Sequence, residues 1–270
     1  MVVQHNMAAS NANRQLGIST NVLSKSTEKL SSGYRINRAA DDAAGLSISE
    51  KMRSQVRGLN KASSNAQDGI SAIQTAEGAL NEAHSILQRM NELATQAAND
   101  TNTTTDRTAV QSEIDALTKE ITRIASTTQF NTQNLLDGKF TGKNLQVGAL
   151  KGQSISISIK TMNATALGVD ALKVGSFGAA GSAMKKIQTA IDKVSTQRSN
   201  LGALQNRLEH TVNNLDNVAE NTQTAESRIR DTDMASEMVQ YSATSIIQQA
   251  GQSMLAQANS QTQGVLSLIQ

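Results

Sequence analysis

The stretch that decides the fold of this chain is residues 59–97, which read LNKASSNAQDGISAIQTAEGALNEAHSILQRMNELATQA. An aliphatic or small residue recurs in it every seven positions, and a second row follows three positions after each. The first row is Leu59, Ala66, Ile73, Leu80, Leu87 and Ala94, and the second row is Ala62, Gly69, Ala76, Ala83, Met90 and Ala97. This spacing is typical of a coiled-coil seam, and the small second row lets neighbouring helices approach closely. The stretch predicts a helix of nearly 60 Å in a tight bundle, at about 1.5 Å per residue.

Two further segments show apolar residues at helical spacing, so their apolar faces can pack against that of residues 59–97. After a polar break at 99–105, with Asp106 expected as a helix cap, apolar residues alternate in steps of four and three. This second segment contains Val110, Ile114, Leu117, Ile121, Ile124 and Thr128. The third segment repeats at sevens through Ile187, Val194, Leu201, Leu208, Leu215, Thr222 and Ile229. We expect the three segments to pack together, with Leu80 and Leu208 in the core.

A different period separates the second and third segments. Residues 153–160 read QSISISIK and alternate strictly with period two, while 145–147 precede them across two glycines. This pattern predicts a small β-hairpin at about 141–175. The expected fold class is all-α: a long antiparallel coiled-coil helical bundle with a small inserted β-hairpin and with its N- and C-terminal helices paired.

The two ends of the chain form a separate pair of amphipathic helices. The N-terminal one carries Leu16, Leu23 and Leu30 at a spacing of seven, and the C-terminal one carries Ala243, Ile246, Ile247, Ala250, Met254 and Ala258. Such a narrow pair is marginal alone in water, so we expect it to gain stability from identical neighbours. We therefore take Leu16, Leu23, Leu30, Ile246, Ile247 and Met254 as candidate polymerisation residues, in helices that order together on polymerisation.

Composition excludes several classes of protein. The 270 residues include two Tyr, three Phe and no Trp, so the core is expected to be aliphatic. They include no Cys, which excludes disulfides, thiolate nucleophiles and Cys-ligated metals, and no Pro, which favours long uninterrupted helices. A net charge of +2 with only Lys185-Lys186 as a basic run predicts no nucleic-acid partner. No stretch approaches the roughly 18 apolar residues of a membrane span. Residues 1–8 also lack the apolar core of a signal peptide, so we expect a soluble chain or export by another route.

The residues that could support enzymatic chemistry do not form a catalytic set. The histidines are His5, His84 and His210, and none stands in a metal-binding spacing. Asp41-Asp42 is expected to cap a helix, and residues 138–144 have too short a spacing for a phosphate loop and are expected to form a turn. We expect no catalytic, cofactor-binding or metal-binding residues, no cofactor, and no enzymatic activity.

Three stretches give the chain a resemblance to a known family. Residues 26–48 read STEKLSSGYRINRAADDAAGLSI, residues 246–259 read IIQQAGQSMLAQAN and are followed by VLSL at 265–268, and residues 201–208 read LGALQNRL. Together these stretches resemble bacterial flagellin. The resemblance implies an inner terminal coiled-coil domain at 1–40 and 231–270, and a helical rod domain at 41–230. With only the hairpin region inserted, the chain is similar to a short flagellin without outer variable domains.

The resemblance also implies a function and partners. It implies a structural subunit that polymerises into the bacterial flagellar filament for motility, secreted to the outside of the cell. The implied partners are identical subunits, the flagellar export chaperone, the filament cap and the flagellin-sensing Toll-like receptor of animal hosts. Residues 87–96 and 111–114 resemble the receptor-binding segment, which implies Arg89, Leu93 and Glu113 as contacts. The seam register turns Arg89 and Leu93 toward flanking faces, and an exposed Arg beside a Leu is typical of a binding hot spot. Asn91 departs from the Arg common at its position in strongly stimulatory relatives.

Two alternatives remain at the level of the sequence. A hook–filament junction protein shares the terminal coiled coil of flagellin. A cytoplasmic coiled-coil signalling scaffold, such as a chemoreceptor hairpin, fits the heptads alone. Only the filament subunit is expected to grow long filaments from seeds.

Overall fold

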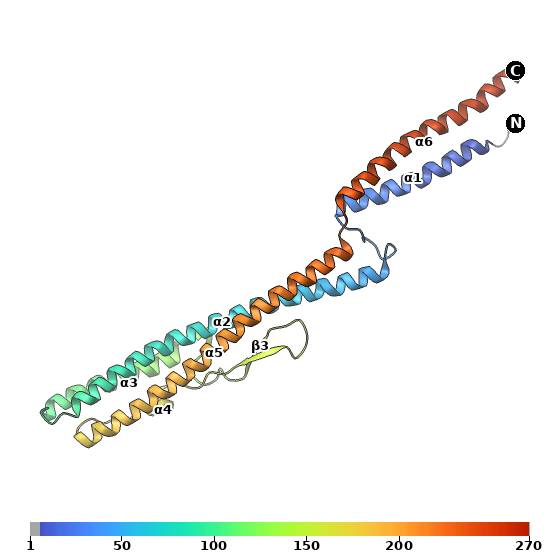
Figure 1. Ribbon diagram of the computed structural model, residues 1–270. Helices are drawn as coiled ribbons and strands as arrows, with labels where there is room; N and C mark the ends of the chain where they lie inside the picture. Colours follow the sequence, from blue (N-terminus) through green and yellow to red (C-terminus); the bar gives the residue numbers. More distant parts are fainter. Residues whose placement is uncertain (1–5, 270) are drawn as a thin grey trace. The chain divides into compact units, whose positions relative to one another are not determined.

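The computed structural model describes residues 6–269, with side chains described through residue 261. Six helices and four short strands follow one another along this part of the chain (Figure 1). They are α1 (Met7–Ser32), α2 (Ala43–Ala97), α3 (Thr104–Thr127), β1 (Gln129–Phe130), β2 (Gln133–Asn134), β3 (Lys143–Gln146), β4 (Ser154–Ile157), α4 (Ala164–Leu167), α5 (Phe177–Arg230) and α6 (Met234–Ile269). The mostly helical fold with a small inserted hairpin is thus confirmed.

The chain divides into two compact units. One contains the described residues up to Ser54 and from Asn221 onward, and the other contains Gln55–Glu220. The domain boundaries expected from the sequence, at 40/41 and 230/231, stay a prediction. The helices themselves are interrupted near those positions, at 33–42 and at 231–233.

The core of the second unit is the predicted seam. Both rows of α2 are buried along their whole length, from Leu59 to Ala97, and they meet the buried row of α5. Leu80 and Leu208 are fully buried, as predicted. Across the seam the Ser63 hydroxyl donates to Asp216 at 2.9 Å, and Arg198 pairs with Glu77 at 3.6 Å, which sets the antiparallel register of α2 and α5.

The turn between α2 and α3 is fixed by side chains that satisfy free helix ends. Arg107 Nε donates to the carbonyl of Ala97 at 3.1 Å, at the C-terminus of α2. The expectation that Asp106 caps α3 is wrong, because the N-cap is Thr103. Asp106 stands three residues later and accepts from the backbone N–H of Thr103 at 2.9 Å, which completes a capping box.

The predicted hairpin is β3 and β4, paired antiparallel with Leu145 opposite Ile155. The hairpin approaches α2 closely, because a Cβ atom added at Gly58 would lie 2.8 Å from the Cβ of Ala149. Further along the helix, Asn65 Nδ2 donates to the carbonyl of Gln146 at 3.1 Å. The hairpin therefore lies directly against the backbone of α2.

The sequence did not predict a second, smaller hairpin or the short helix α4. Strands β1 and β2 have two residues each and pair through Gln129 opposite Asn134. The two residues between the strands, Asn131 and Thr132, both have positive φ, of 47° and 63°. A β-branched residue such as Thr132 is strained in this region.

In the first unit α1 and α6 lie side by side and antiparallel (Figure 1). Asn6 Nδ2 donates to the carbonyl of Ala258 at 2.9 Å near one end of the pair, and Lys29 pairs with Glu237 at 3.5 Å near the other. The two interruptions also bond to each other: the Thr232 N–H donates to the Gly33 carbonyl at 3.0 Å. No helix in the described part of the chain is long and apolar enough to span a membrane.

Candidate assembly interface

Helix α6 contacts α1 through a face that is mostly polar or small. The buried or half-buried positions of α6 recur in steps of three and four. They are Glu237, Tyr241, Thr244, Ser245, Gln248, Gly251, Leu255 and Ala258. Small residues on this face allow close packing: a Cβ atom at Gly251 would lie 3.5 Å from Cδ1 of Leu16. The pair is thus held by close packing and scattered hydrogen bonds, including Gln248 Nε2 to Thr20 Oγ1 at 3.3 Å.

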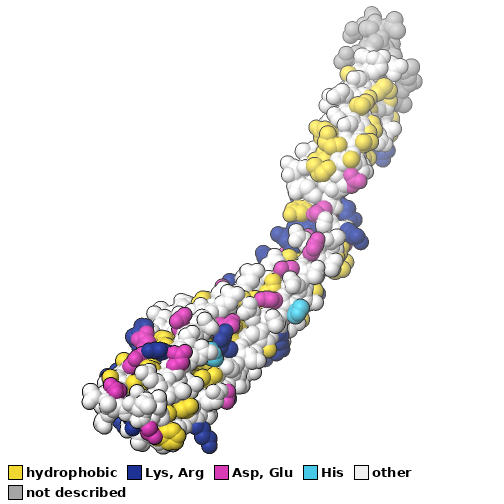
Figure 2. Space-filling view, turned by 60° about the vertical axis from the view of Figure 1, so that its left-hand side comes forward, with side chains coloured by type: hydrophobic (Ala, Val, Ile, Leu, Met, Phe, Trp, Pro, Cys, Tyr) yellow, Lys and Arg dark blue, Asp and Glu magenta, His cyan; other side chains and the backbone are white. Residues whose placement is uncertain are grey.

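The aliphatic face of α6 is left uncovered in the single chain. Val239 is 71 % exposed, Ile246 66 %, Ile247 57 % and Met254 64 %. Together with the exposed Ala243 and Ala250, these residues form the α6 stripe. Figure 2 shows hydrophobic side chains gathered on the terminal helix pair. A contiguous apolar surface of this kind marks a site of interaction with another molecule.

Charge does not interrupt the α6 stripe. From Met238 through Gln270 the sequence contains no Asp, Glu, Lys or Arg. A surface without charged groups carries no desolvation penalty for burying an ion when it docks against another surface. The α6 stripe is therefore suited to a tight protein–protein contact.

The structure does not bring the six candidate polymerisation residues onto one surface. Leu16, Leu23 and Leu30 are half-buried in the α1·α6 pair. Ile246, Ile247 and Met254 lie on the uncovered face of α6. Sequence reasoning also missed Val239, which stands seven residues before Ile246 and could have been found by extending the repeat one step toward the N-terminus.

The candidate receptor segment contains an exposed ion-pair network between α2 and α3. Arg89 Nη2 lies 3.0 Å from Glu113 Oε1, and Arg89 Nη1 lies 3.2 Å from Glu92 Oε2. The hydrogen bonds to Glu113, and then those to Glu92, raise the pKa of Arg89 above its ordinary value. The side chains of Arg89 and Glu113 are 53 % and 46 % exposed, so this network is accessible to a partner.

The expectation that Leu93 turns away from the core as a receptor contact is wrong. Leu93 is 2 % exposed and belongs to the hydrophobic core of the second unit. The physical reason is that α2 packs against α3 as well as α5 here, so its apolar stripe is wider than two heptad rows. Leu93 thus supports the surface from below and does not form part of it.

The side-chain amide of Gln111, in the neighbouring helix α3, also makes hydrogen bonds within the protein. Its Oε1 accepts from the backbone N–H of Val174 at 3.0 Å, and its Nε2 donates to the carbonyl of Leu172 at 2.9 Å. Both ends of the amide therefore fasten the segment before α5 onto α3. Of the residues in this region, Arg89 and Glu113 are left as candidate contacts.

In the described part of the chain, no three His, Asp or Glu side chains come together in a way that could hold a metal ion. His84 is half-buried with its Nε2 atom 3.0 Å from Nε2 of Gln88, and His5 lies outside the described residues. Asp42 accepts from the backbone N–H of Gly45 at 2.8 Å at the start of α2, and Asp41 accepts from that of Arg38 at 3.0 Å. Asp42 therefore bonds to the first turn of α2, whereas Asp41 bonds to the backbone of the turn that precedes this helix.

Comparison with known families gives two matches that together span most of the chain. Residues 3–141 match the bacterial flagellin N-terminal helical region. Residues 184–269 match the bacterial flagellin C-terminal helical region. The unmatched part between them contains β3, β4, α4 and the start of α5.

Individual relatives agree with these matches. The chain is 55 % identical to a flagellin of Halalkalibacterium halodurans over 271 residues, covering all of both chains. It is 50 % identical over 286 residues to the flagellar filament 31.3 kDa core protein of Treponema maltophilum, again covering all of both chains. The crystal structure of Bacillus cereus flagellin is 34 % identical with a TM-score of 0.50, covering 56 % of this chain and 88 % of that one.

Proposed function

This chain belongs to the bacterial flagellin family and is a structural subunit of the flagellar filament, and we propose that the α6 stripe is the surface through which it joins identical subunits. It is a short member of the family. Between α3 and α5 the chain builds only the strands β1–β4 and the helix α4, which leaves no room for a further domain. The terminal helices at 1–40 and 231–270 would then form the assembling domain, and the rod at 41–230 its support.

The observation that carries this proposal is the uncovered α6 stripe. Burying an apolar side chain of the size of Ile or Met contributes roughly 1.5–3 kcal/mol, so several such residues supply a strong contact. If the stripe docks on a different surface of the next copy, the contact is heterologous. Repeats of a heterologous contact that does not close build an open helical filament.

The half-buried leucines of α1 have a separate role in this proposal. Leu16, Leu23 and Leu30 hold α1 against α6 and so position the stripe. Their contribution to polymerisation would pass through the stability of the pair. Ile246, Ile247 and Met254 would contact the neighbouring subunit directly.

The neighbouring alternatives are not favoured by the relatives. The Halalkalibacterium relative is named flagellin, and the Treponema relative is named a core protein of the flagellar filament.

A truncation tests the proposal. A chain ending at residue 230 keeps the seam between α2 and α5 and should stay soluble and helical. We expect it to fail to lengthen filament seeds under conditions in which the full chain does so, as counted by negative-stain microscopy. Long filaments grown from the truncated chain would remove α6 from the assembly mechanism.

Before assembly the α6 stripe needs protection. An apolar helix face in the cytoplasm invites aggregation, and helix-in-groove binding is a common way to cover one. The flagellar export chaperone is therefore proposed to bind α6, and the filament cap to receive the same helix at the growing tip. Export through the flagellum would place the assembled subunits outside the cell.

Recognition by the flagellin-sensing Toll-like receptor of animals is a second proposed function. The observation that favours it is the exposed network of Arg89 with Glu113, since accessible Arg side chains are common centres of protein interfaces. A surface covered by neighbouring subunits would be open only on released monomers. We therefore expect binding by the monomer and little by filaments.

Surface plasmon resonance with the receptor ectodomain tests this second function. Arg89→Ala and Glu113→Ala should each weaken monomer binding, because each removes one half of the network. Arg123→Ala is a matched control, since Arg123 is an exposed arginine of α3 paired with Glu120. Unchanged binding by both test variants would show that Arg89 and Glu113 are not contacts of the receptor.

A further inference from the structure

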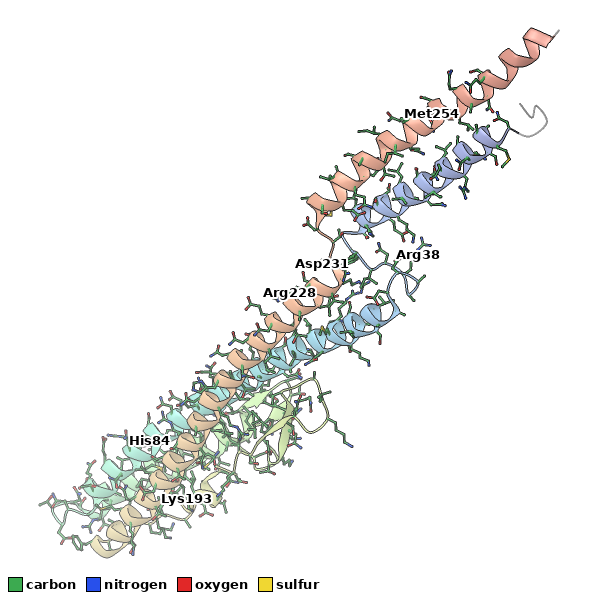
Figure 3. All side chains as sticks on the ribbon, turned by 45° about the vertical axis from the view of Figure 1, so that its right-hand side comes forward. Arg38, His84, Lys193, Arg228, Asp231 and Met254 are labelled. Carbon is green, nitrogen blue, oxygen red and sulfur yellow. The ribbon has the colours of Figure 1, made fainter. Side chains whose placement is uncertain are left out.

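Met254 combines an oxidisable side chain with a position in the assembly surface. The chain has no Cys, so the thioethers of its nine Met residues are the sulfur groups open to oxidation. Met90 and Met162 are buried in the core, whereas Met254 is 64 % exposed and lies on α6 (Figure 3). Met7, Met234 and Met238 are also exposed but are not part of the α6 stripe. Met254 is therefore the methionine whose oxidation would change the stripe itself.

We propose that Met254 is a site of oxidative modification, and that its conversion to the sulfoxide by a peroxide stops the subunit from joining the filament. The inference rests on the proposed role of the α6 stripe in assembly. In a helix the side chain of Met254 leans over the preceding turn, where the neighbouring stripe residues are Ala250 and Ile247, and neither can donate a hydrogen bond. A sulfoxide oxygen brought into such a contact would be buried without a partner.

The chemical step is a two-electron oxygen transfer. A lone pair of the Met254 sulfur attacks one oxygen of hydrogen peroxide, so an S–O bond forms and the O–O bond breaks. The sulfur is oxidised to the sulfoxide, the leaving hydroxide takes up the proton released from the transferred oxygen, and the peroxide is reduced to water. Methionine sulfoxide is reversible by enzymatic reduction, so the block can be removed.

The modification acts on assembly and not on the fold of the single chain. Met254 lies outside the face of α6 that contacts α1. That face includes Gly251 and Leu255, which precede and follow Met254 in the sequence. A sulfoxide there stays in contact with water in the monomer. In the filament Met254 would be covered, so oxidation is expected in free subunits and not in assembled ones.

The experiment compares three full-length proteins before and after treatment with hydrogen peroxide. They are the natural chain, Met254→Leu, which keeps an apolar side chain of similar size, and Met7→Leu, which removes a different exposed methionine. Peptide mass mapping follows each sulfoxide, with Met90 as the buried internal control. Circular dichroism checks that helical content is unchanged, and elongation of filament seeds is the readout.

Oxidised natural chain and oxidised Met7→Leu should elongate seeds about tenfold more slowly or worse, the size expected for burying one unpaired polar oxygen. Oxidised Met254→Leu should elongate as fast as its untreated form. Met254→Gln, a polar side chain of similar length, should be slow without any oxidant. Full elongation by the oxidised natural chain, or equal slowing of oxidised Met254→Leu, would overturn the inference while leaving the filament proposal intact. Failure of the untreated natural chain to elongate seeds would instead overturn the proposed function, and this inference with it.

Discussion

Thr132 is the clearest case of a residue whose backbone conformation does not suit its side chain. It occupies the second position of the two-residue turn between β1 and β2 with φ of 63°, and its side chain is exposed. The left-handed region costs an ordinary residue roughly 1–2 kcal/mol, and a glycine avoids this cost. The strain is not offset by any core contact of the side chain, because the position is on the surface.

Thr132→Gly is therefore expected to stabilise the chain. The gain should be about 0.5–1 kcal/mol, since relief of strain exceeds the extra chain entropy that glycine loses on folding. Urea unfolding measures it, with Asn131→Gly as a control that should gain less, because Asn tolerates this region better. A loss of stability in Thr132→Gly would show that the threonine side chain makes a contact worth more than the strain.

Asp106 makes the start of α3 sensitive to acid. Hydrogen bonds from the Thr103 hydroxyl, at 2.7 Å, and from its backbone N–H hold the pKa of Asp106 below its ordinary value. A group with a lowered pKa in the folded state adds stability above its unfolded pKa of about 3.9 and loses it as the pH falls through the folded pKa. The capping box should therefore weaken only in strong acid.

Amide hydrogen exchange at residues 104–107 checks this expectation. Protection should fall as the pH drops below about 4, after correction for the intrinsic exchange rate. In Asp106→Asn this pH dependence should vanish, and Thr103→Val should return the pKa of Asp106 toward its ordinary value. Protection that follows the same pH curve in the natural chain and in Asp106→Asn would contradict the role given to the carboxylate.

At the scale of elements, the heptad rows predicted the long helices. They did not predict how many other helices pack against each of them. The period of Leu59, Ile73 and Leu80 specifies which residues share a face of α2, and the structure buries that face. The same period cannot say how many helices cover the face, which is why Leu93 was misplaced. The side of α6 that faces α1 and the α6 stripe could be told apart only in the structure, since both sides repeat at seven.

The elements that the sequence missed are those too short to show a period. Strands β1 and β2 have two residues each and α4 has four. Alternation needs about four residues to be recognised, and a helical stripe needs more. The capping box at Thr103 could have been predicted, because Thr followed three residues later by an acid is its sequence signature.

Because the β3–β4 hairpin packs against α2 at one glycine of this helix and not at another, alanine substitutions at the two glycines should have opposite effects on stability. A Cβ atom added at Gly78 would meet no heavy atom within 4 Å, so Gly78→Ala should stabilise α2 by about 0.5–1 kcal/mol through helix propensity. Gly58→Ala meets both the Cβ and the backbone of Ala149 and should destabilise by about 1 kcal/mol or more. Thermal unfolding of the two variants side by side measures the difference. Equal stabilisation by both variants would mean that the hairpin does not pack against α2 at Gly58.

At the scale of the whole molecule, the two compact units differ in what holds them together. The unit of residues 55–220 has a continuous aliphatic core, whereas α6 meets the half-buried leucines of α1 with mostly small and polar side chains. Helix pairs of that kind depend on further contacts for their stability. The proposed assembly supplies those contacts by covering the α6 stripe.

Hydrogen exchange should reflect this difference. In the monomer, amides of 7–32 and 234–261 should exchange much faster than those of 59–97, and polymerisation should slow the first two sets strongly while leaving the third unchanged. Mass spectrometry of proteolytic peptides from monomer and filament measures it. Strong protection of both terminal helices in the monomer would contradict the idea that they order together on polymerisation.

The central claim is that the α6 stripe drives filament growth, and the most direct test is seeded elongation by the double variant Ile246→Ser/Ile247→Ser. Both residues are exposed in the single chain, so its helical content and melting temperature should stay those of the natural chain. Elongation should fall by about a hundredfold or more, because two buried Ile side chains are removed from each contact. Met234→Ser, on the same helix but outside the stripe, should elongate normally. Growth of the double variant at the natural rate would contradict the account.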